Sequence, residues 1–226
     1  MSPTTADKVW LIVPLFNEAE VIGDVIREAH RSFPRIVCID DGSRDNSANV
    51  ARDAGAVVIQ HPINLGQGAA LQTGFDYVLN NTAAQYVITF DADGQHDPIE
   101  ALAMVERAKQ EGLAIIYGSR FLDNRTKPGL LKQIVLKTAV LVTRLTVGLK
   151  LTDAHNGLRL IRRDALAQIN IRQDGMAHAS EIVSQLAQTD LPWAEAPVHI
   201  RYTDYSRAKG QSLLNSVNIL VDLLMR

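Results

Sequence analysis

The sequence predicts an α/β fold in which a mostly parallel β-sheet carries helices on both faces. Short apolar runs alternate with amphipathic segments through the first half of the chain. These runs are apolar throughout, which is typical of strands buried on both faces of a sheet. The 226 residues, 46% of them hydrophobic, suffice to bury a large core without a disulfide or a structural metal. We therefore expect one domain over residues 1–226.

Five strands and four helices are expected in the first half. The strands are Val9–Pro14, Arg35–Ile39, Ala56–Gln60, Tyr86–Phe90 and Ala114–Tyr117. The helices are Glu18–Arg31, Asn46–Asp53, Gly68–Leu79 and Ile99–Gln110. Parallel strands joined by right-handed crossovers leave a ligand crevice at their carboxyl ends. We therefore expect a site at that edge of the sheet.

The second half contains two apolar stretches that predict C-terminal amphipathic helices. Gly129–Leu149 carries Lys132, Lys137 and Arg144, a pattern that suits a helix lying on a membrane surface. A core helix with one solvated face explains the same pattern equally well. Ser212–Arg226 has one polar stripe on an otherwise apolar surface. It would pack on the domain's own core, on another subunit in a homo-oligomer, or on lipid.

Composition argues against several classes of protein. The net charge of −2 and the aromatic content of 5% lack the basic, aromatic surface of a nucleic-acid binder. The single cysteine, Cys38, lies in the second expected strand and excludes an internal disulfide framework. The first seven residues do not combine a basic start with an apolar stretch, so no signal peptide is expected. We expect the protein to act in the cytoplasm.

Polar side chains follow three of the expected strands. They are Asn17 and Glu18 after the first strand, Asp40 and Asp41 after the second, and Asp91 and Asp93 after the fourth. Parallel strands bring their carboxyl ends to one edge, so these side chains are expected to gather there. A fold without a site has no need of carboxylates in that place.

The sequence Asp91-Ala92-Asp93 predicts a metal site. Two carboxylates one residue apart can face one hard cation, and Mg²⁺ or Mn²⁺ leaves coordination positions open for substrate phosphates. A calcium loop of the EF-hand type is excluded, because Gln95 and His96 stand where that loop needs other residues. The neighbouring Asp40 and Asp41 repel each other, and we expect hydrogen bonds to a base or ribose to compensate.

A glycine-rich turn precedes the third expected helix, at Asn64-Leu65-Gly66-Gln67-Gly68. It is similar to the opening of a dinucleotide-binding fingerprint, but Leu71 takes the place of the third glycine. The turn also follows the third strand rather than the first, which disfavours a nicotinamide cofactor. A glycine such as Gly66 at a helix N-terminus can still lie close to a flat ligand or an anion.

Several motifs occur in a fixed order along the chain. They are Pro14-Leu15-Phe16-Asn17-Glu18, Asp40-Asp41-Gly42-Ser43, Asn64-Leu65-Gly66, Asp91-Ala92-Asp93-Gly94-Gln95-His96-Asp97-Pro98, Gly118-Ser119-Arg120, Asp153 with Gly157-Leu158-Arg159, and Arg207-Ala208-Lys209-Gly210-Gln211-Ser212. Taken together, they resemble the family 2 inverting glycosyltransferases, and most closely the dolichyl- or polyprenyl-phosphate sugar synthases. The resemblance implies a GT-A fold, in which residues 8–120 bind a nucleotide sugar and residues 121–226 bind the acceptor.

The resemblance also implies roles for individual residues. The nucleoside pocket would be lined by Pro14, Asn17, Glu18, Asp40 and Asp41. Asp91 and Asp93 would hold Mg²⁺ or Mn²⁺, with Gln95 as a further ligand. Arg120 and Arg159 would lie toward the acceptor, and Arg207 would close a loop over the donor phosphates.

The chain departs from the family pattern in two places. Leu213 stands where the family often has a lysine, which puts the loop's phosphate contact in doubt unless Lys209 replaces that charge. The chain is also expected to lack the membrane helices of many bacterial relatives. A lipid acceptor would then require interfacial helices or a small membrane partner, at the inner face of the cell membrane.

Two acceptors fit the sequence. A polyprenyl phosphate is already anionic and needs only cations to position it, for which Arg120 and Arg159 are candidates. A sugar hydroxyl needs a base, and Asp153 or Glu181 could supply one. We favour the lipid phosphate and leave UDP- and GDP-linked donors open.

Two other classes of protein are alternatives to a glycosyltransferase. A sugar-phosphate nucleotidyltransferase is disfavoured, because Pro14–Glu18 is not a glycine-rich, basic loop. A non-catalytic subunit that binds a nucleotide sugar stays an alternative.

Overall fold

The computed structural model describes residues 8–123, 150–153, 156–175 and 177–201. The predictions made for Gly129–Leu149 and Ser212–Arg226, and those for Arg207, Lys209 and Leu213, lie outside these residues. Among the described residues, no helix is both long and apolar enough to cross a membrane.

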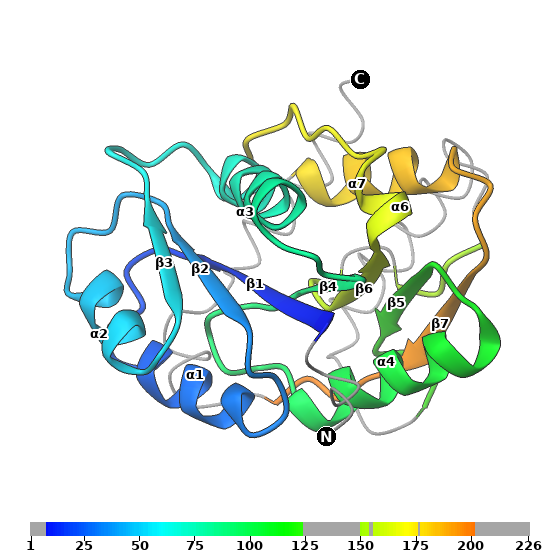
Figure 1. Cartoon of the computed structure of the whole chain (residues 1–226), viewed down its shortest axis with the longest axis horizontal. Coiled ribbons are helices and arrows are strands. Elements are labelled where there is room, and N and C mark those ends of the chain that lie inside the picture. The colour runs from blue at the N-terminus through cyan, green and yellow to red at the C-terminus, as the bar shows by residue number, and fades with distance from the viewer. Residues whose placement is uncertain (1–7, 124–149, 154–155, 176, 202–226) are drawn as a thin grey trace, which may run out of the picture.

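Seven strands of the described chain form one sheet in the order β3-β2-β1-β4-β6-β5-β7 (Figure 1). They are β1 (Val9–Leu15), β2 (Ile36–Asp40), β3 (Val57–Gln60), β4 (Tyr86–Thr89), β5 (Ile115–Ser119), β6 (Arg159–Arg162) and β7 (Trp193–Pro197). All the pairings are parallel except those of β6, which runs antiparallel to both β4 and β5. The prediction of a mostly parallel sheet is confirmed.

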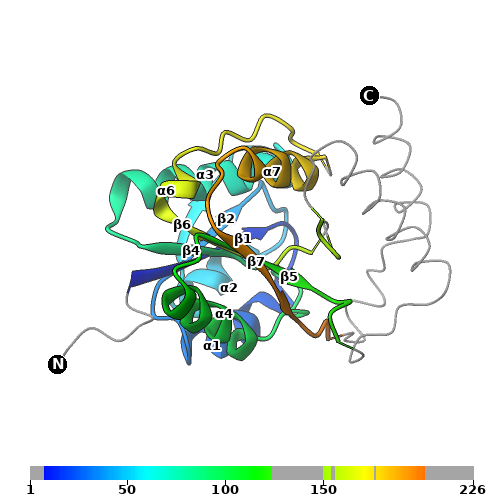
Figure 2. The same ribbon diagram turned by 90° about the vertical axis from the view of Figure 1, so that its right-hand side faces the viewer.

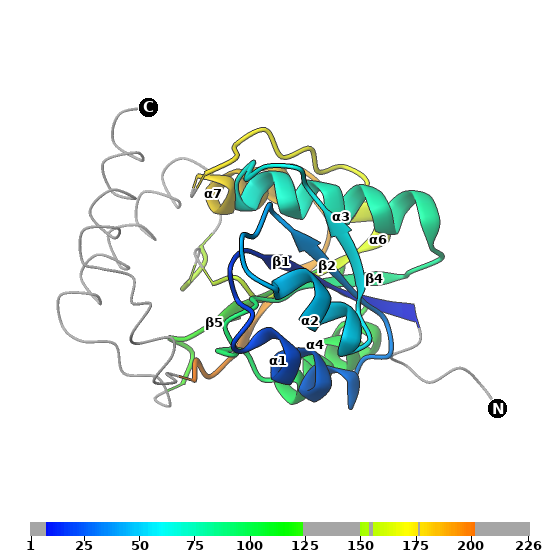
Figure 3. The same cartoon turned by 90° about the vertical axis from the view of Figure 1, so that its left-hand side faces the viewer.

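Helices cover both faces of the sheet, as predicted. One face carries α1 (Ile22–His30), α2 (Ser47–Asp53) and α4 (Pro98–Glu111), and the other carries α3 (Gln67–Asn81), α6 (Arg163–Leu166) and α7 (His178–Ala187). Figures 2 and 3 show the sheet between these two layers. Each layer closes its own cluster of buried apolar side chains against the sheet, and fully buried strands such as β2 contribute to both clusters.

The five predicted strands and four predicted helices are all present, with ends shifted by a few residues. The largest shift is at α1, which begins at Ile22 rather than Glu18 because a turn over residues 18–21 precedes it. Strands β6 and β7 were not predicted. Both come from the second half of the chain, so the sheet combines strands from residues on either side of position 120.

The direction of β6 decides what lies at the ligand edge of the sheet. In the pairing of β4 with β6, Thr89 at the end of β4 lies opposite Arg159 at the start of β6. The Thr89 hydroxyl also donates a hydrogen bond of 2.5 Å to the carbonyl oxygen of Gly157, just before β6. An antiparallel strand begins where its parallel neighbours end. Arg159 therefore lies at the same edge as the aspartates that follow β2 and β4.

Candidate active site

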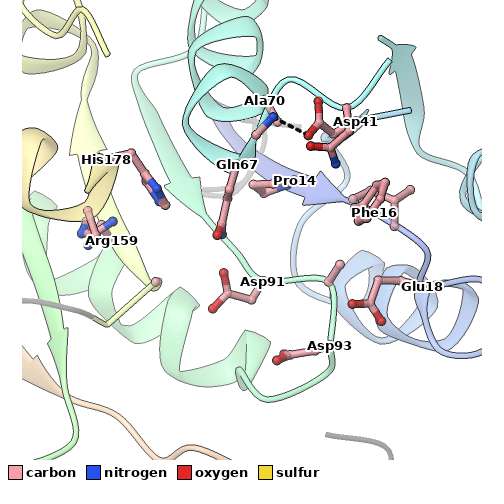
Figure 4. Close-up of a pocket in the computed structure, with 16 residues that line it drawn as sticks. Pro14, Phe16, Glu18, Asp41, Gln67, Ala70, Asp91, Asp93, Arg159 and His178 are labelled. Atoms are coloured by element: carbon pink, nitrogen blue, oxygen red, sulfur yellow. Dashed lines mark hydrogen bonds between the residues drawn. The ribbon is translucent and has the colours of Figure 1, made fainter. Parts of the chain in front are cut away.

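A cavity of about 400 Å³ opens at the edge where β1 and β4 end and β6 begins. Figure 4 shows side chains from widely separated segments of the chain pointing into it. The residues that line it are Pro14, Leu15, Phe16, Glu18, Asp41, Asn64, Gly66, Gln67, Ala70, Asp91, Ala92, Asp93, Gly157, Arg159, His178 and Ala179. Side chains of Asp91 and Asp93 therefore share one cavity with Asp41, as the strand-end pattern predicts.

The loop after β4 holds its two aspartates in different ways. The Nε2 atom of His96 lies 2.8 Å from Oδ2 of Asp91. The His96 ring is buried, and its Nδ1 has no hydrogen-bond partner among the described residues, so Nε2 carries the proton and donates it to Asp91. Asp93 accepts a hydrogen bond of 3.0 Å from the backbone amide of Gln95. Asp91 is thus oriented by a side chain and Asp93 by a single peptide group.

These surroundings shift the two pKa values in opposite directions. Burial opposes ionisation of Asp91, but His96 and Arg159 outweigh it and hold the pKa of Asp91 below its ordinary value. Burial and the neighbouring charge of Asp91 raise the pKa of Asp93 to about 6. The pair therefore carries negative charge that the protein itself leaves partly uncompensated.

The donor set fits a hard divalent cation. Mg²⁺ and Mn²⁺ accept carboxylate oxygens and keep their remaining positions for water or phosphate oxygens. A cation beside Asp91 and Asp93 would relieve the repulsion that raises the pKa of Asp93. Gly157 leaves the space that this requires, since a Cβ atom there would overlap the carboxylate of Asp91. No cluster of three or more His, Cys, Asp or Glu side chains suited to a metal occurs among the described residues.

Asp41 lines the cavity and is held by the segment between β3 and α3. Its Oδ1 accepts hydrogen bonds from Leu65 N at 2.9 Å and from His61 Nδ1 at 2.8 Å, and its Oδ2 accepts one from Gly66 N at 2.8 Å. The other ring nitrogen of His61 is 2.9 Å from the Thr73 hydroxyl. Gly66 caps α3 with φ +99°, a conformation that favours glycine, and a side chain there would also overlap Asp174.

Asp40 is directed away from the cavity. It is 1% exposed and accepts hydrogen bonds from Ser43 N at 3.2 Å and Gln60 Nε2 at 3.0 Å. The expectation that a base or ribose compensates the charges of Asp40 and Asp41 therefore needs correction. Protein donors already do so, because the loops after β2 and β3 fold back onto both carboxylates.

The end of β1 and the loop after it contribute residues that line the cavity and residues that support the loop. Pro14, Phe16 and Glu18 line the cavity. Asn17, with φ +53°, does not, and its side-chain oxygen accepts a hydrogen bond of 2.8 Å from Arg44 N. Asn17 thus fixes the loop rather than facing the cavity. Gln95 is likewise absent from the lining, and its backbone oxygen accepts a hydrogen bond of 3.0 Å from Arg201 N.

Arg120 and Asp153 bind each other. Two guanidinium nitrogens of Arg120 lie 2.6 and 2.8 Å from the two carboxylate oxygens of Asp153, and the Arg120 amide donates a third bond of 3.1 Å. The side chain of Asp153 is 1% exposed, and neither residue lines the cavity. Glu181 also lies outside it, and accepts hydrogen bonds from the amides of Arg172 and Gln173.

Arg159 and His178 form the side of the cavity opposite Phe16 and Asp41 (Figure 4). Arg159 is 2% exposed and begins β6. His178 is 4% exposed and begins α7. Sequence reasoning missed Phe16, Asn64, Gln67, Gly157 and His178 as lining residues. The first four stand inside the quoted motifs, whereas nothing in the sequence around His178 distinguished it.

The chain is similar in sequence to known proteins, several of them glycosyltransferases. The family described as "Glycosyl transferase family 2" matches residues 10–169, more than half of the chain. An uncharacterized protein of Methanocaldococcus jannaschii is 32% identical over 97% of this chain and 92% of its own length. The UDP-N-acetylglucosamine–dolichyl-phosphate N-acetylglucosaminyltransferase of Methanococcus voltae is 27% identical over 97% of this chain and 96% of its own. The polyprenol monophosphomannose synthase of Mycolicibacterium smegmatis is 29% identical over 94% and 83%.

A solved structure shares the fold. Glucosyl-3-phosphoglycerate synthase from Mycobacterium tuberculosis, in complex with Mg²⁺ and uridine diphosphate, superposes with a TM-score of 0.69 over 96% of this chain and 79% of that chain. The two sequences are 17% identical, so this likeness concerns the fold alone. The predicted GT-A architecture is confirmed. The chain therefore belongs to glycosyl transferase family 2 and is a glycosyltransferase.

Proposed function

We propose that this glycosyltransferase moves a sugar from a nucleoside diphosphate sugar to a polyprenyl phosphate, with inversion at the anomeric carbon and with Mg²⁺ or Mn²⁺. The observation that carries the proposal is the arrangement of one cavity. Asp91 and Asp93 lie between a side formed by Phe16, Glu18 and Asp41 and a side formed by Arg159 and His178.

The side with Phe16 and Asp41 is assigned to the nucleoside. Phe16 is 42% exposed although it lines the cavity, and an aromatic face of this kind can stack on a base. Carboxylates such as Asp41 and Glu18 accept hydrogen bonds from base or ribose donors. Asp41 is fixed in place by His61 and two backbone amides, so it would meet the nucleoside without reorganisation.

The diphosphate is assigned to the middle of the cavity. Asp91 and Asp93 would hold the cation there, and a bound cation neutralises charge that develops on the departing nucleoside diphosphate. His96 orients the carboxylate of Asp91, and Gly157 keeps the space in front of it open. Gly66, which precedes α3, also lines the cavity, and a helix N-terminus favours an anionic ligand.

The acceptor is assigned to the side of Arg159. A guanidinium group matches phosphate oxygens, and a phosphate monoester is anionic without the help of a base. The carboxylates considered as bases for a hydroxyl acceptor, Asp153 and Glu181, lie outside the cavity and are engaged with other protein groups. This favours the phosphate acceptor, as do relatives named for dolichyl phosphate and polyprenol.

Inversion follows if the acceptor oxygen attacks the anomeric carbon opposite the leaving diphosphate. In this proposal the diphosphate lies at Asp91 and the acceptor lies toward Arg159, which is a separate side chain of the same cavity. A lipid acceptor would place the reaction at a membrane surface. Contact through Gly129–Leu149 or through a small membrane partner stays a prediction, as does a homo-oligomer.

The test is a transfer assay with defined components. The full chain is incubated with UDP-glucose, UDP-N-acetylglucosamine or GDP-mannose, with undecaprenyl phosphate in detergent micelles, and with Mn²⁺ or Mg²⁺. We expect a sugar-phosphate-lipid product whose anomeric configuration is opposite to that of the donor, and no product in EDTA. Transfer that persists in EDTA, or that requires a sugar hydroxyl in place of the lipid phosphate, would contradict the proposal.

A further inference from the structure

His178 is a buried histidine that none of the motifs above accounts for. It is the first residue of α7, its side chain faces the cavity, and the residue is 4% exposed (Figure 4). Its ring lies on the same side as Arg159, with Asp91 between this side and the side of Phe16. A buried polar ring that faces a ligand cavity is placed to contact the ligand.

The hydrogen bonds of His178 define which ring nitrogen can do so. Nδ1 lies 2.7 Å from the backbone oxygen of Gly175, which can only accept a hydrogen bond. Nδ1 therefore carries the proton. Burial lowers the pKa of His178, which favours the neutral ring. Nε2 of a neutral ring protonated at Nδ1 is a hydrogen-bond acceptor, and no protein donor to it occurs among the described residues.

The loop that fixes this tautomer is itself fixed from both sides. Glu181 accepts hydrogen bonds from the amides of Arg172 and Gln173, at 3.0 and 2.9 Å. The amide of Gly68 in α3 donates a bond of 3.0 Å to the carbonyl oxygen of Asp174. The carbonyl of Gly175 and the ring of His178 are therefore set by the packing of α3 against α7.

Glycines make this packing possible. A Cβ atom at Gly68 would overlap the backbone oxygen of Gln173 and approach the Cβ of His178 to 2.9 Å. A Cβ atom at Gly66 would overlap the backbone oxygen of Asp174. The glycine-rich turn thus serves the position of His178 as well as that of Asp41.

We propose that Nε2 of His178 accepts a hydrogen bond from a hydroxyl group of the transferred sugar and so helps to select the donor. The inference rests on the proposed function, which places the nucleoside at Phe16 and Asp41 and the diphosphate at Asp91. The sugar then extends beyond the diphosphate toward Arg159 and His178. A fixed acceptor discriminates well, since a sugar that lacks the hydroxyl leaves a buried group unpaired.

The experiment compares His178→Phe, His178→Gln and wild type in two measurements. The first is binding of UDP or GDP with Mn²⁺, which involves no sugar. The second is kcat/KM with the best of the three nucleotide sugars and with its single-deoxy analogues. His30→Phe is the matched control, because His30 ends α1 on the opposite face of the sheet.

We expect His178→Phe to leave binding of the free nucleotide within about twofold and to lower kcat/KM for the sugar donor roughly tenfold to a hundredfold. One deoxy analogue should lose activity with wild type yet lose little more with His178→Phe, because the contact it lacks is already gone. His178→Gln keeps an acceptor and should retain more activity than His178→Phe. If His178→Phe does not fold, His178→Gln is compared with wild type in the same two measurements, with a smaller expected loss of kcat/KM.

Three results would overturn the inference. One is an unchanged kcat/KM for every donor in both His178 variants. Another is an equal loss in the binding of free nucleotide with Mn²⁺, which would make His178 a ligand of the metal or diphosphate. A third is full additivity of His178→Phe with every deoxy analogue. An inactive wild type would reject the proposed function and, with it, this inference, whereas the three results above leave the proposed function intact.

Discussion

Two pairs of aspartates follow two strands of the same sheet, and the protein treats them in opposite ways. Asp40 and Asp41, at the end of β2, are 1% and 3% exposed and accept hydrogen bonds from side chains and backbone amides. After β4, Asp91 accepts a hydrogen bond from His96, and Asp93 accepts one from the amide of Gln95. Protein groups compensate the charges of the first pair, whereas the second pair has fewer hydrogen-bond donors.

This difference separates carboxylates whose charge the protein itself compensates from carboxylates whose charge it leaves for a cation. Buried charge costs stability unless hydrogen bonds or counter-ions compensate it. The loop carrying Leu65 and Gly66 supplies that compensation for Asp41. The pKa of Asp93 rises to about 6 instead, because burial and the charge of Asp91 outweigh the Gln95 amide and His96, which act to lower it. Changes at the two pairs should therefore separate stability from activity.

The largest effect is expected from Asp93→Ala. Removing a ligand of the proposed cation should lower turnover roughly a thousandfold, since a bound cation contributes several kcal/mol to the stabilisation of the leaving group. The free energy of unfolding should not fall, because the carboxylate is already destabilised by its surroundings. Transfer assays measure the loss of turnover, and urea denaturation measures the free energy of unfolding. Turnover near that of wild type would remove Asp93 from the mechanism.

Asp41→Asn, unlike Asp93→Ala, should lower the stability of the protein. An asparagine turns its NH₂ group toward one of the donors that Asp41 now accepts from, which should lower the free energy of unfolding by about 2–3 kcal/mol. Urea denaturation without ligand measures this loss. Asp53→Asn is the control, because Asp53 is an exposed residue at the end of α2. Equal losses in the two variants would mean that the Asp41 network does not stabilise the fold.

His96→Phe should weaken the metal site without removing a ligand. The ring can still pack against Phe90, whose centroid is 5.5 Å from that of His96, but the hydrogen bond to Asp91 is lost. We expect the Mn²⁺ concentration for half-maximal activity to rise about tenfold to a hundredfold, the usual effect of removing a group that orients a ligand. A lower maximal rate with an unchanged Mn²⁺ requirement would contradict this positioning role.

The smallest expected effect is on the pH dependence of stability, and it arises from Asp93. Its folded pKa of about 6 lies above the ordinary value of 3.8, so its protonated form stabilises the fold. This contribution is complete below about pH 3.8 and is lost as the pH rises through 6. In the absence of divalent cations, wild type should lose stability between these values relative to Asp93→Asn. Identical pH profiles for the two proteins would refute the assignment.

The sequence predicted β1 to β5 correctly and did not predict β6 or β7. β1 to β4 and the helices between them follow from apolar runs and their spacing, because each strand is followed by its own crossover helix. β6 has only four residues and holds charged Arg159 and Arg162 at its ends, so no local pattern marks it as a strand. It is a strand because it fills the gap between β4 and β5.

The candidate site divides in the same way. Asp41, Asp91, Asp93, Glu18 and Pro14 were expected from strand ends, and all line the cavity. Six other expected residues do not: Asn17, Asp40, Gln95, Arg120, Asp153 and Glu181. Their side chains or backbone groups bind neighbouring loops, and a motif cannot tell a residue that binds a ligand from one that binds the loop holding it.

Taken alone, the sequence determined the fold class, the family and the edge of the sheet where carboxylates gather, because these depend on patterns local to each strand and turn. The tertiary structure decided the direction of β6, the pairing of Arg120 with Asp153, and the place of His178 beside Arg159. These depend on contacts between residues far apart in the chain. Their geometry arises only when α3, α7 and the sheet pack together.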